Sequence, residues 1–430
     1  MTYLHSVQSP EGAFAPARYE CGWTTAGELA REKAAWRKLA DEAIEPNPVY
    51  CSNVLVAAER HLRAGRPIPL LIVRDCARGG ALAGVFPLEE RGWRNGFPGR
   101  ALSLFVNPFT SLTHPLIRRD DALVVLGEAV RYLARAGHGS LLFPFLTEKR
   151  GFYAALDEAA RREGLALSRV ERWSRPAVEP EVGKGGDFYA RNYVSKSRRS
   201  SGERRLRRLQ EIGAVEFPSL FVDEPGGREA FQAFLQMERD SWKGKAGTAL
   251  LCRQATRDFA QEAFSGADHA PSARIRSLTL DGRPIAMALD LESQGVVYAF
   301  KAAYDQTYAH FSPGLMLDAH TAAHIGENDE IKRLDSFAQT EIAQAAVWRQ
   351  EEPILRSVLA LSPQAYRTEA LARRLRIATA TRNRVKYFVR RSREIASLGA
   401  NVASGRKWSI VLLALAAGAP VVSTVVTHLR

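Results

Sequence analysis

The 430-residue sequence predicts an α/β protein built as a tandem of two copies of one fold, each a mixed sheet flanked by helices. Helix-period and strand-period patterns alternate along the chain, which is typical of α/β domains. The chain also repeats itself, because RDCARGGALAGVFPLE (74–89) and LTLDGRPIAMALDLE (278–292) both combine a strand, a glycine turn and a strand. Its composition, 46% hydrophobic and 25% charged, is that of an ordinary globular protein.

The first copy is expected over residues 22–180, after a polar lead-in at residues 1–21. Some of its segments have apolar residues at helical spacing, and others are short β-prone runs bounded by turn residues. Gly65 and the two prolines of EPNPVYCSN (45–53) mark helix ends. The predicted helices are 25–42, 54–64, 120–136 and 152–163, and the predicted strands are 68–74, 81–88, 101–106, 140–144 and 165–171.

The second copy is expected over residues 181–350 and follows the same rhythm. Asp281-Gly282 between two alternating runs predicts a hairpin turn. The predicted helices are 195–212, 227–242 and 254–265, and the predicted strands are 214–218, 273–280, 285–291, 296–300 and 331–334.

Residues 296–326 of the second copy combine a buried strand, a polar loop and a helix start. Ser312 suits an N-cap, and Pro313 suits the first helical position, where its missing N–H has no consequence. Gly314 leaves the backbone bare, so that a ligand could approach it closely. A helix start offers N–H groups and a positive dipole end, and it therefore suits a phosphate. The alternative is a capped helix start that binds no ligand. The strand exit is lined with polar groups: Lys301, Tyr304, Asp305 and His310.

The formal net charge of +13 is concentrated in two segments. Residues 190–209 carry eight Arg or Lys against Glu203, and residues 364–407 carry twelve against Glu369 and Glu394. The predicted helix 195–212 is therefore either a solvated basic face or an anion site for phosphates, acidic sugars or nucleic acid. Nucleic acid is less favoured, because aromatic residues are not interleaved with the basic ones.

Other motifs carry less information. Trp242 and its neighbouring glycines and lysines form either an exposed recognition loop or a plain helix end with a surface tryptophan. His320 and His324 lie four apart, but the glutamate of an H-E-x-x-H metal motif is missing, so we predict no metal site. Neither a G-x-S-x-G elbow nor a Walker loop occurs.

Five motifs of the chain resemble the FemABX/CelD-like branch of the GNAT acyltransferase superfamily, whose members are often associated with cellulose biosynthesis. The resemblance covers about residues 22–350. The motifs are Trp36 with PNPVYCSN, GVFPL (84–88), YVSKSRRSSGERRLRRLQEIG (193–213), MERDSWKGKAGTAL (237–250) and FKAAYDQTYAHFSPGLML (300–317). The resemblance implies two GNAT-like domains and transfer of an acyl group from a thioester, with acyl-CoA such as acetyl-CoA as the expected donor, to an amine or hydroxyl.

Such a transfer needs a proton acceptor for the nucleophile and hydrogen-bond donors for the developing oxyanion. We expect the second domain to be active. Asp305, Glu238 and Asp290 are the base candidates, and Lys301 could add positive charge at the oxyanion. The expected donor-phosphate site is Ser312, Pro313, Gly314, Leu315 and Met316, and the expected substrate contacts are Lys196, Arg199, Trp242, Lys243 and Tyr304.

The end of the chain differs from the rest. Residues 351–407 are expected to be helical and basic, and residues 409–427 carry no charge. The apolar segment 408–430 could span a membrane, lie in its interface or pack on the body. The N-terminus shows no secretory signal and the four cysteines form no C-x-x-C pair, which together favour a reducing, cytoplasmic location, with the inner membrane face as an option.

The leading hypothesis is a two-domain acyl-CoA-dependent N- or O-acyltransferase acting on a small or glycan-like acceptor in polysaccharide or envelope biosynthesis. A second enzyme hypothesis is aminoacyl-tRNA-dependent transfer, as in the Fem relatives, which would explain the basic segments. A third is a non-catalytic accessory protein at the membrane surface.

Overall fold

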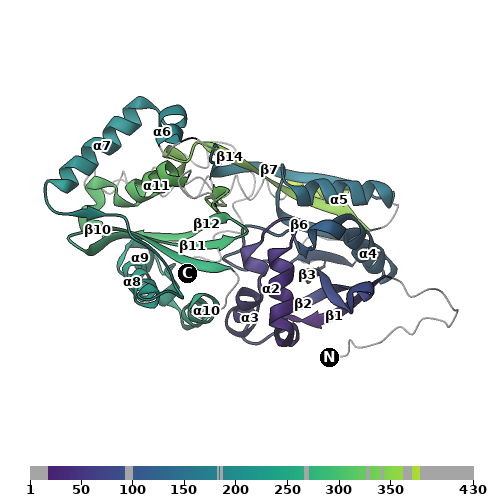
Figure 1. The fold of residues 1–430 in the computed structure, drawn as a ribbon. Helices are drawn as coiled ribbons and strands as arrows, with labels where there is room; N and C mark the ends of the chain where they lie inside the picture. Colours follow the sequence, from purple (N-terminus) through teal and green to yellow (C-terminus); the bar gives the residue numbers. More distant parts are fainter. Residues whose placement is uncertain are drawn as a thin grey trace, which may run out of the picture. The chain divides into compact units, whose positions relative to one another are not determined.

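The computed structural model describes residues 18–92, 100–181, 184, 187–265, 271–325, 330–339, 343–361 and 370–377. Its strands form one 14-stranded sheet with helices on both faces (Figure 1). The path of the sheet is β1-β2-β3-β4-β6-β14-β7-β13-β12-β11-β10-β8, with β5 paired to β3 and β9 paired to β10. The predicted α/β fold class, with two like halves, is confirmed.

The first half forms close to the predicted segments. Trp36 is buried and donates its indole N–H to the Tyr50 carbonyl at 3.2 Å, while the Tyr50 hydroxyl donates to the Phe105 carbonyl at 2.7 Å, so the PNPVYCSN link is part of the core. The strands are β1 (Tyr19–Thr25), β2 (Pro69–Asp75), β3 (Ala81–Arg91), β4 (Ala101–Leu104), β5 (Leu116–Ile117), β6 (Ser140–Thr147) and β7 (Leu167–Val178). The helices are α1 (Ala26–Leu29), α2 (Lys33–Asp41), α3 (Ser52–Ala57), α4 (Ala122–Arg135) and α5 (Gly151–Arg162).

The second half repeats the arrangement. Helix α11 lies against one face of β10, β11 and β12, and α8 lies against the other (Figure 1). The helices are α6 (Asp187–Tyr193), α7 (Lys196–Gln210), α8 (Gly227–Asp240), α9 (Trp242–Lys245), α10 (Gln254–Phe264) and α11 (Pro313–His324), with a short 3-10 helix η8 (Gln306–Phe311) before α11. The strands are β8 (Val215–Glu216), β9 (Ser219–Phe221), β10 (Ser272–Leu280), β11 (Arg283–Ser293), β12 (Val296–Tyr304), β13 (Arg333–Asp335) and β14 (Gln350–Ala360).

The two halves share one strand pattern. In the first, the antiparallel strands β2, β3 and β4 are followed through α4 by β6, which pairs with β4 in parallel. In the second, the antiparallel strands β10, β11 and β12 are followed through α11 by β13, which pairs with β12 in parallel. A parallel pair of strands needs such a crossover connection. Both halves therefore connect their strands in the same order.

The halves exchange their last strands. Strand β7 of the first half pairs with β13 of the second, and β14 of the second half pairs with β6 of the first. The two exchanged strands also pair with each other over most of their length. The halves therefore share backbone hydrogen bonds and are joined in one sheet.

Two expectations about the chain ends are wrong. Residues 350–360 form β14, not the start of a basic helix, because Pro353 disfavours a helix interior and the apolar run is buried in the middle of the sheet. Residues 19–21 belong to edge strand β1, which pairs with β2, and are not lead-in. Helical structure is found at residues 370–377, while residues 378–407 and the apolar segment 408–430 lie outside the described residues. Among the described helices, none is long and apolar enough to cross a membrane.

Buried ion pairs hold the exchanged strands together. The Arg175 guanidinium on β7 meets the Asp335 carboxylate on β13 through Nε at 2.7 Å and through a second nitrogen at 2.9 Å. Arg333 and Glu352 join β13 to β14 at 2.7 Å. Removing one member of such a pair leaves an uncompensated buried charge, which is strongly destabilising.

We therefore predict that Asp335→Ala lowers the free energy of unfolding by about 3–5 kcal/mol, because Arg175 stays buried without its partner. Asp157→Ala is the control, since Asp157 pairs with Arg161 at the surface and its loss should change stability by about 0.5 kcal/mol or less. Urea unfolding of the two variants tests this, and equal stabilities would contradict it.

Candidate functional site

The site begins where β12 loses one of its two neighbours. Strand β13 pairs with β12 only from Val296 to Tyr298, so among the described strands residues 299–304 have only β11 beside them. The register shifts at this point, because Leu289 faces Lys301 while Asp290 faces Ala299, which makes Phe300 the extra residue of a bulge. An unpaired strand edge presents free N–H and C=O groups, and a bulge re-aims the side chains around it.

Lys301 and Glu238 meet beside this bulge. The Glu238 carboxylate, at the end of α8, is fully buried and pairs with the Lys301 ammonium at 2.7 Å. Its other oxygen accepts the Leu250 N–H at 2.8 Å. Lys301 also lies over the Phe109 ring, 5.7 Å from its centre. The pair places a positive charge, held by a buried carboxylate, next to the open edge of β12.

A second lysine reaches the same edge from α9. Ser241 ends α8 and caps α9 by accepting the Lys243 N–H at 3.1 Å, which turns the chain sharply. The Lys243 side chain then donates to the Ala302 carbonyl of β12 at 2.5 Å. Burial and the nearby charge of Lys301 lower the pKa of Lys243 to about 8, against the opposing pull of Glu238. A large part of the Lys243 side-chain population is therefore a neutral amine near pH 8. Trp242, just before it, is 53% exposed.

The helix start after β12 has the predicted form. Ser312 is the N-cap of α11 and Pro313 is its first residue, so the predicted helix start is confirmed. Ser312 has a left-handed backbone with φ 57, and its hydroxyl accepts from the Arg205 guanidinium at 3.2 Å and caps no N–H of the helix. A side chain at position 314 would meet the Tyr304 ring at 3.7 Å, so the helix start lies against the end of β12.

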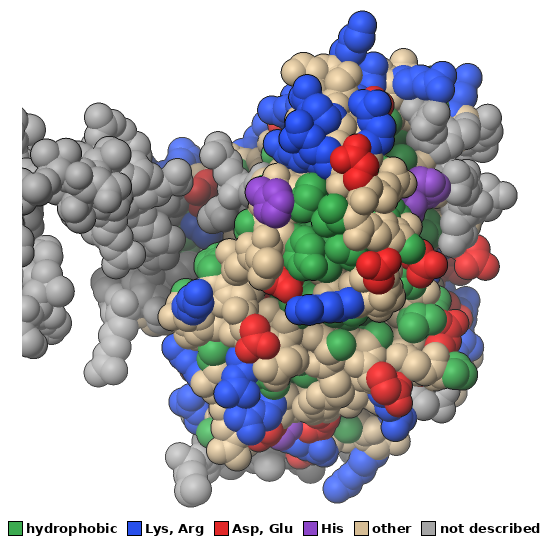
Figure 2. All heavy atoms as spheres, turned by 90° about the vertical axis from the view of Figure 1, so that its left-hand side faces the viewer, with side chains coloured by type: hydrophobic (Ala, Val, Ile, Leu, Met, Phe, Trp, Pro, Cys, Tyr) green, Lys and Arg blue, Asp and Glu red, His purple; other side chains and the backbone are tan. Residues whose placement is uncertain are grey.

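A basic groove lies beside this helix start. It has a volume of ≈ 520 Å³ and lies between α7 and η8. Figure 2 shows basic side chains gathered on this face beside an apolar patch. The lining residues are Ser201, Arg204, Arg205, Arg208, Glu211, His310 and Phe311. Three arginines on two neighbouring turns of one helix attract anions, and a volume of this order suits a nucleotide-sized group.

The other residues predicted from the sequence lie around the open edge of β12, and most of them make contacts that hold helices and strands in place. Asp305 caps η8 by accepting the Thr307 N–H at 2.9 Å and pairs with Arg283 at 3.2 Å. Asp290 is buried in an ion pair with Arg276. Arg199 donates to the carbonyls that end α6, and Lys196 is exposed at the first turn of α7.

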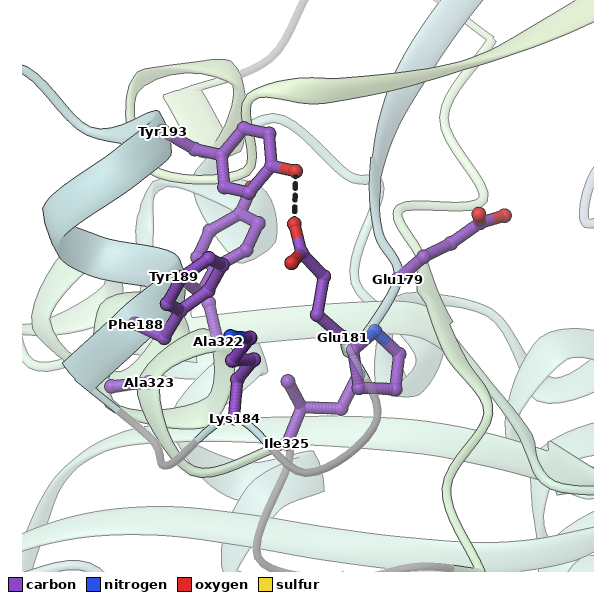
Figure 3. Close-up of a pocket in the computed structure, with 10 residues that line it drawn as sticks. Glu179, Glu181, Lys184, Phe188, Tyr189, Tyr193, Ala322, Ala323 and Ile325 are labelled. Carbon is purple, nitrogen blue, oxygen red and sulfur yellow. Dashed lines mark hydrogen bonds between the residues drawn. The ribbon is translucent and has the colours of Figure 1, made fainter.

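The YVSKSRR motif anchors α6 and α7. The rings of Tyr189 and Tyr193 stack with centres 4.9 Å apart, and the Tyr193 hydroxyl donates to Glu181 at 2.8 Å (Figure 3). The cavity between α6 and α11 that these residues line measures ≈ 10 Å³, room for a single water at most. This part of the motif therefore has a packing role.

Two participants were not predicted: Arg205 and the Ala302 carbonyl. In the sequence, Arg205 is one member of a basic run and is not distinguished from its neighbours. A spacing of three and four residues puts Ser201, Arg204, Arg205 and Arg208 on one helix face. This helical spacing is the feature of the sequence from which the role of Arg205 could have been predicted. Nothing in the sequence indicates that Lys243 reaches Ala302. Among the described residues, no group of three or more His, Cys, Asp or Glu could hold a metal ion.

The lysine cluster yields a prediction about titration. Glu238→Gln should lower the pKa of Lys243 below about 8, because it removes the negative charge that favours the ammonium. Lys301→Met should raise it, because it removes a like charge. NMR titration of ¹³C-labelled lysine side chains measures both shifts, and shifts of the same sign in the two variants would contradict the arrangement.

Part of the second half is similar to a known protein family. Residues 196–342 match the model of the acetyltransferase (GNAT) domain. No curated protein sequence matches the chain significantly.

Solved structures give weaker matches. FemX is 11% identical, with 80% of this chain and 98% of that chain covered and a TM-score of 0.47. The C-terminal domain of a putative lysylphosphatidylglycerol synthetase from Agrobacterium fabrum is 13% identical, with 80% and 94% covered and a TM-score of 0.45. A tandem GNAT protein from the clavulanic acid biosynthesis pathway is 12% identical, with 80% and 99% covered and a TM-score of 0.35. Likenesses this distant carry no functional information. The match to the GNAT acetyltransferase domain model covers the residues of β12, α11 and the basic helix α7.

Proposed function

We propose that this protein transfers an acyl group from acyl-CoA to an amine or hydroxyl acceptor, using the open edge of β12 in its second half. The observation that carries the proposal is the end of β12–β13 pairing at Tyr298, which leaves the rest of β12 open on the strand that leads, through η8, to a helix start suited to phosphate. The GNAT family match over the same residues supports an acyltransferase.

The donor would bind both at the open edge of β12 and at the start of α11. Its pyrophosphate would lie at the first turn of α11, over Ser312 to Met316, with Arg205 adding charge from α7. Its amide-containing arm would run along residues 299–304, whose backbone groups can bind an extended chain as an added strand would. The thioester would then lie near the bulge at Phe300.

The chemistry needs charge beside the thioester carbonyl. As the acceptor attacks, the carbonyl oxygen becomes negative, and N–H groups of the opened strand together with the Lys301 ammonium would stabilise it. Glu238 would position Lys301 through their buried pair. We assign Lys243, at the same edge, and its exposed neighbour Trp242 to the acceptor side, and Asp305 to holding η8 in place.

The acceptor is proposed from the resemblance to the FemABX/CelD-like branch: a small or glycan-like amine or hydroxyl compound of polysaccharide or envelope biosynthesis, handled in the cytoplasm at the inner membrane face. Arg204, Arg205 and Arg208 of α7 support one alternative, an aminoacyl-tRNA donor, because several basic side chains on one helix face can contact neighbouring phosphates of a nucleic acid.

We predict saturable binding of acetyl-CoA to the full chain by calorimetric titration, abolished by Gly314→Trp. The indole would fill the space between the helix start and Tyr304 that the donor phosphates need. Val124→Trp, at an exposed position of α4, is the control and should bind as the wild type does.

Equal binding by the Gly314→Trp variant would overturn the donor site. Absence of acetyl-CoA binding, together with tRNA binding that weakens steeply as salt rises, would favour the tRNA-dependent alternative. Absence of both would favour an accessory protein.

A further inference from the structure

Lys243 has the features of a nucleophile that the proposed transfer does not require. Its amine donates to the Ala302 carbonyl at the open edge of β12, and no carboxylate among the described residues pairs with it. Ser241 fixes the turn that carries it there. The charged groups that face it are Lys301 from β12 and Glu238 from α8, and Glu238 is engaged by Lys301 and the Leu250 N–H.

Lys301 offers a contrast within the same site. Its nitrogen is engaged at 2.7 Å in an ion pair with a fully buried carboxylate. Among the described residues Lys243 has no carboxylate partner, and burial lowers its pKa to about 8, so a sizeable fraction of its amine is neutral near pH 8. The two lysines at the open edge therefore differ: Lys301 is tied to a carboxylate, and Lys243 offers a reactive amine.

We propose that Lys243 is a self-acylation site, whose amine takes the acyl group from a donor bound along the edge of β12. The Lys243 nitrogen would form an amide bond with the carbonyl carbon of the thioester, and the carbon–sulfur bond would break. The proton lost by the amine would leave with the departing thiolate as free thiol. No oxidant, metal or further co-reactant is needed.

This inference rests on the proposed donor site, so the experiment separates the two. The full chain is incubated with acetyl-CoA at pH 8, and acetylation of each lysine is followed by peptide mass spectrometry while calorimetry measures acetyl-CoA binding. Lys245, exposed on the same short helix, is the internal reference, and Lys243→Arg is the control variant. Hydroxylamine treatment removes any thioester formed at the exposed Cys252, which lies beside α9, and leaves a lysine amide intact.

We expect Lys243 to be acetylated about tenfold or more faster than Lys245, because far more of its amine is neutral than in an ordinary lysine of pKa about 10.4. The Gly314→Trp variant should lose this acetylation but remain reactive at Lys243 toward trace acetic anhydride, which needs no donor site. Binding of acetyl-CoA without preferential acetylation of Lys243 would overturn the self-acylation proposal and leave the proposed function standing. Absence of acetyl-CoA binding would overturn both.

Discussion

The candidate site depends on how β13 is held. This strand of three residues pairs on one side with β12 and on the other with β7, where Asp335 is fixed by Arg175. Directly after it, the Ser336 N–H donates to the Pro176 carbonyl at 3.0 Å, and the Phe337 N–H donates to Asp335 at 2.8 Å. The chain therefore leaves β12 to follow β7. Because β7 comes from the first half, the strand exchange between the halves creates the open edge in the second.

At that edge, backbone N–H and C=O groups of β12 have no neighbouring strand and can pair with a ligand. Two lysines lie beside it in different surroundings. Lys301 pairs with the fully buried Glu238 carboxylate, whereas Lys243 donates to the Ala302 carbonyl and burial lowers its pKa to about 8. Arg205 reaches the helix start from α7. The sheet edge, the two lysines and the helix start proposed to bind phosphate are thus brought together by three separate segments of the chain.

Local signals predicted much of this, and long-range ones did not. Ser312-Pro313 marked the start of α11 because capping chemistry is local, and the hairpin at Asp281-Gly282 followed from its turn residues. Strand β14 was missed because its apolar run fits a helix or a strand until its neighbours β6 and β7 are known. The contact of Lys243 with Ala302 spans 59 residues and depends on the turn at Ser241, which no periodicity reveals.

Amide hydrogen exchange with and without acetyl-CoA reports on the backbone of β12 itself and therefore tests whether its open edge binds the donor. We expect acetyl-CoA to slow exchange in peptides covering residues 299–304 and 314–317, while the paired residues 296–298 change little. Protection confined to other parts of the chain, such as β4 and β6 of the first half, would contradict it.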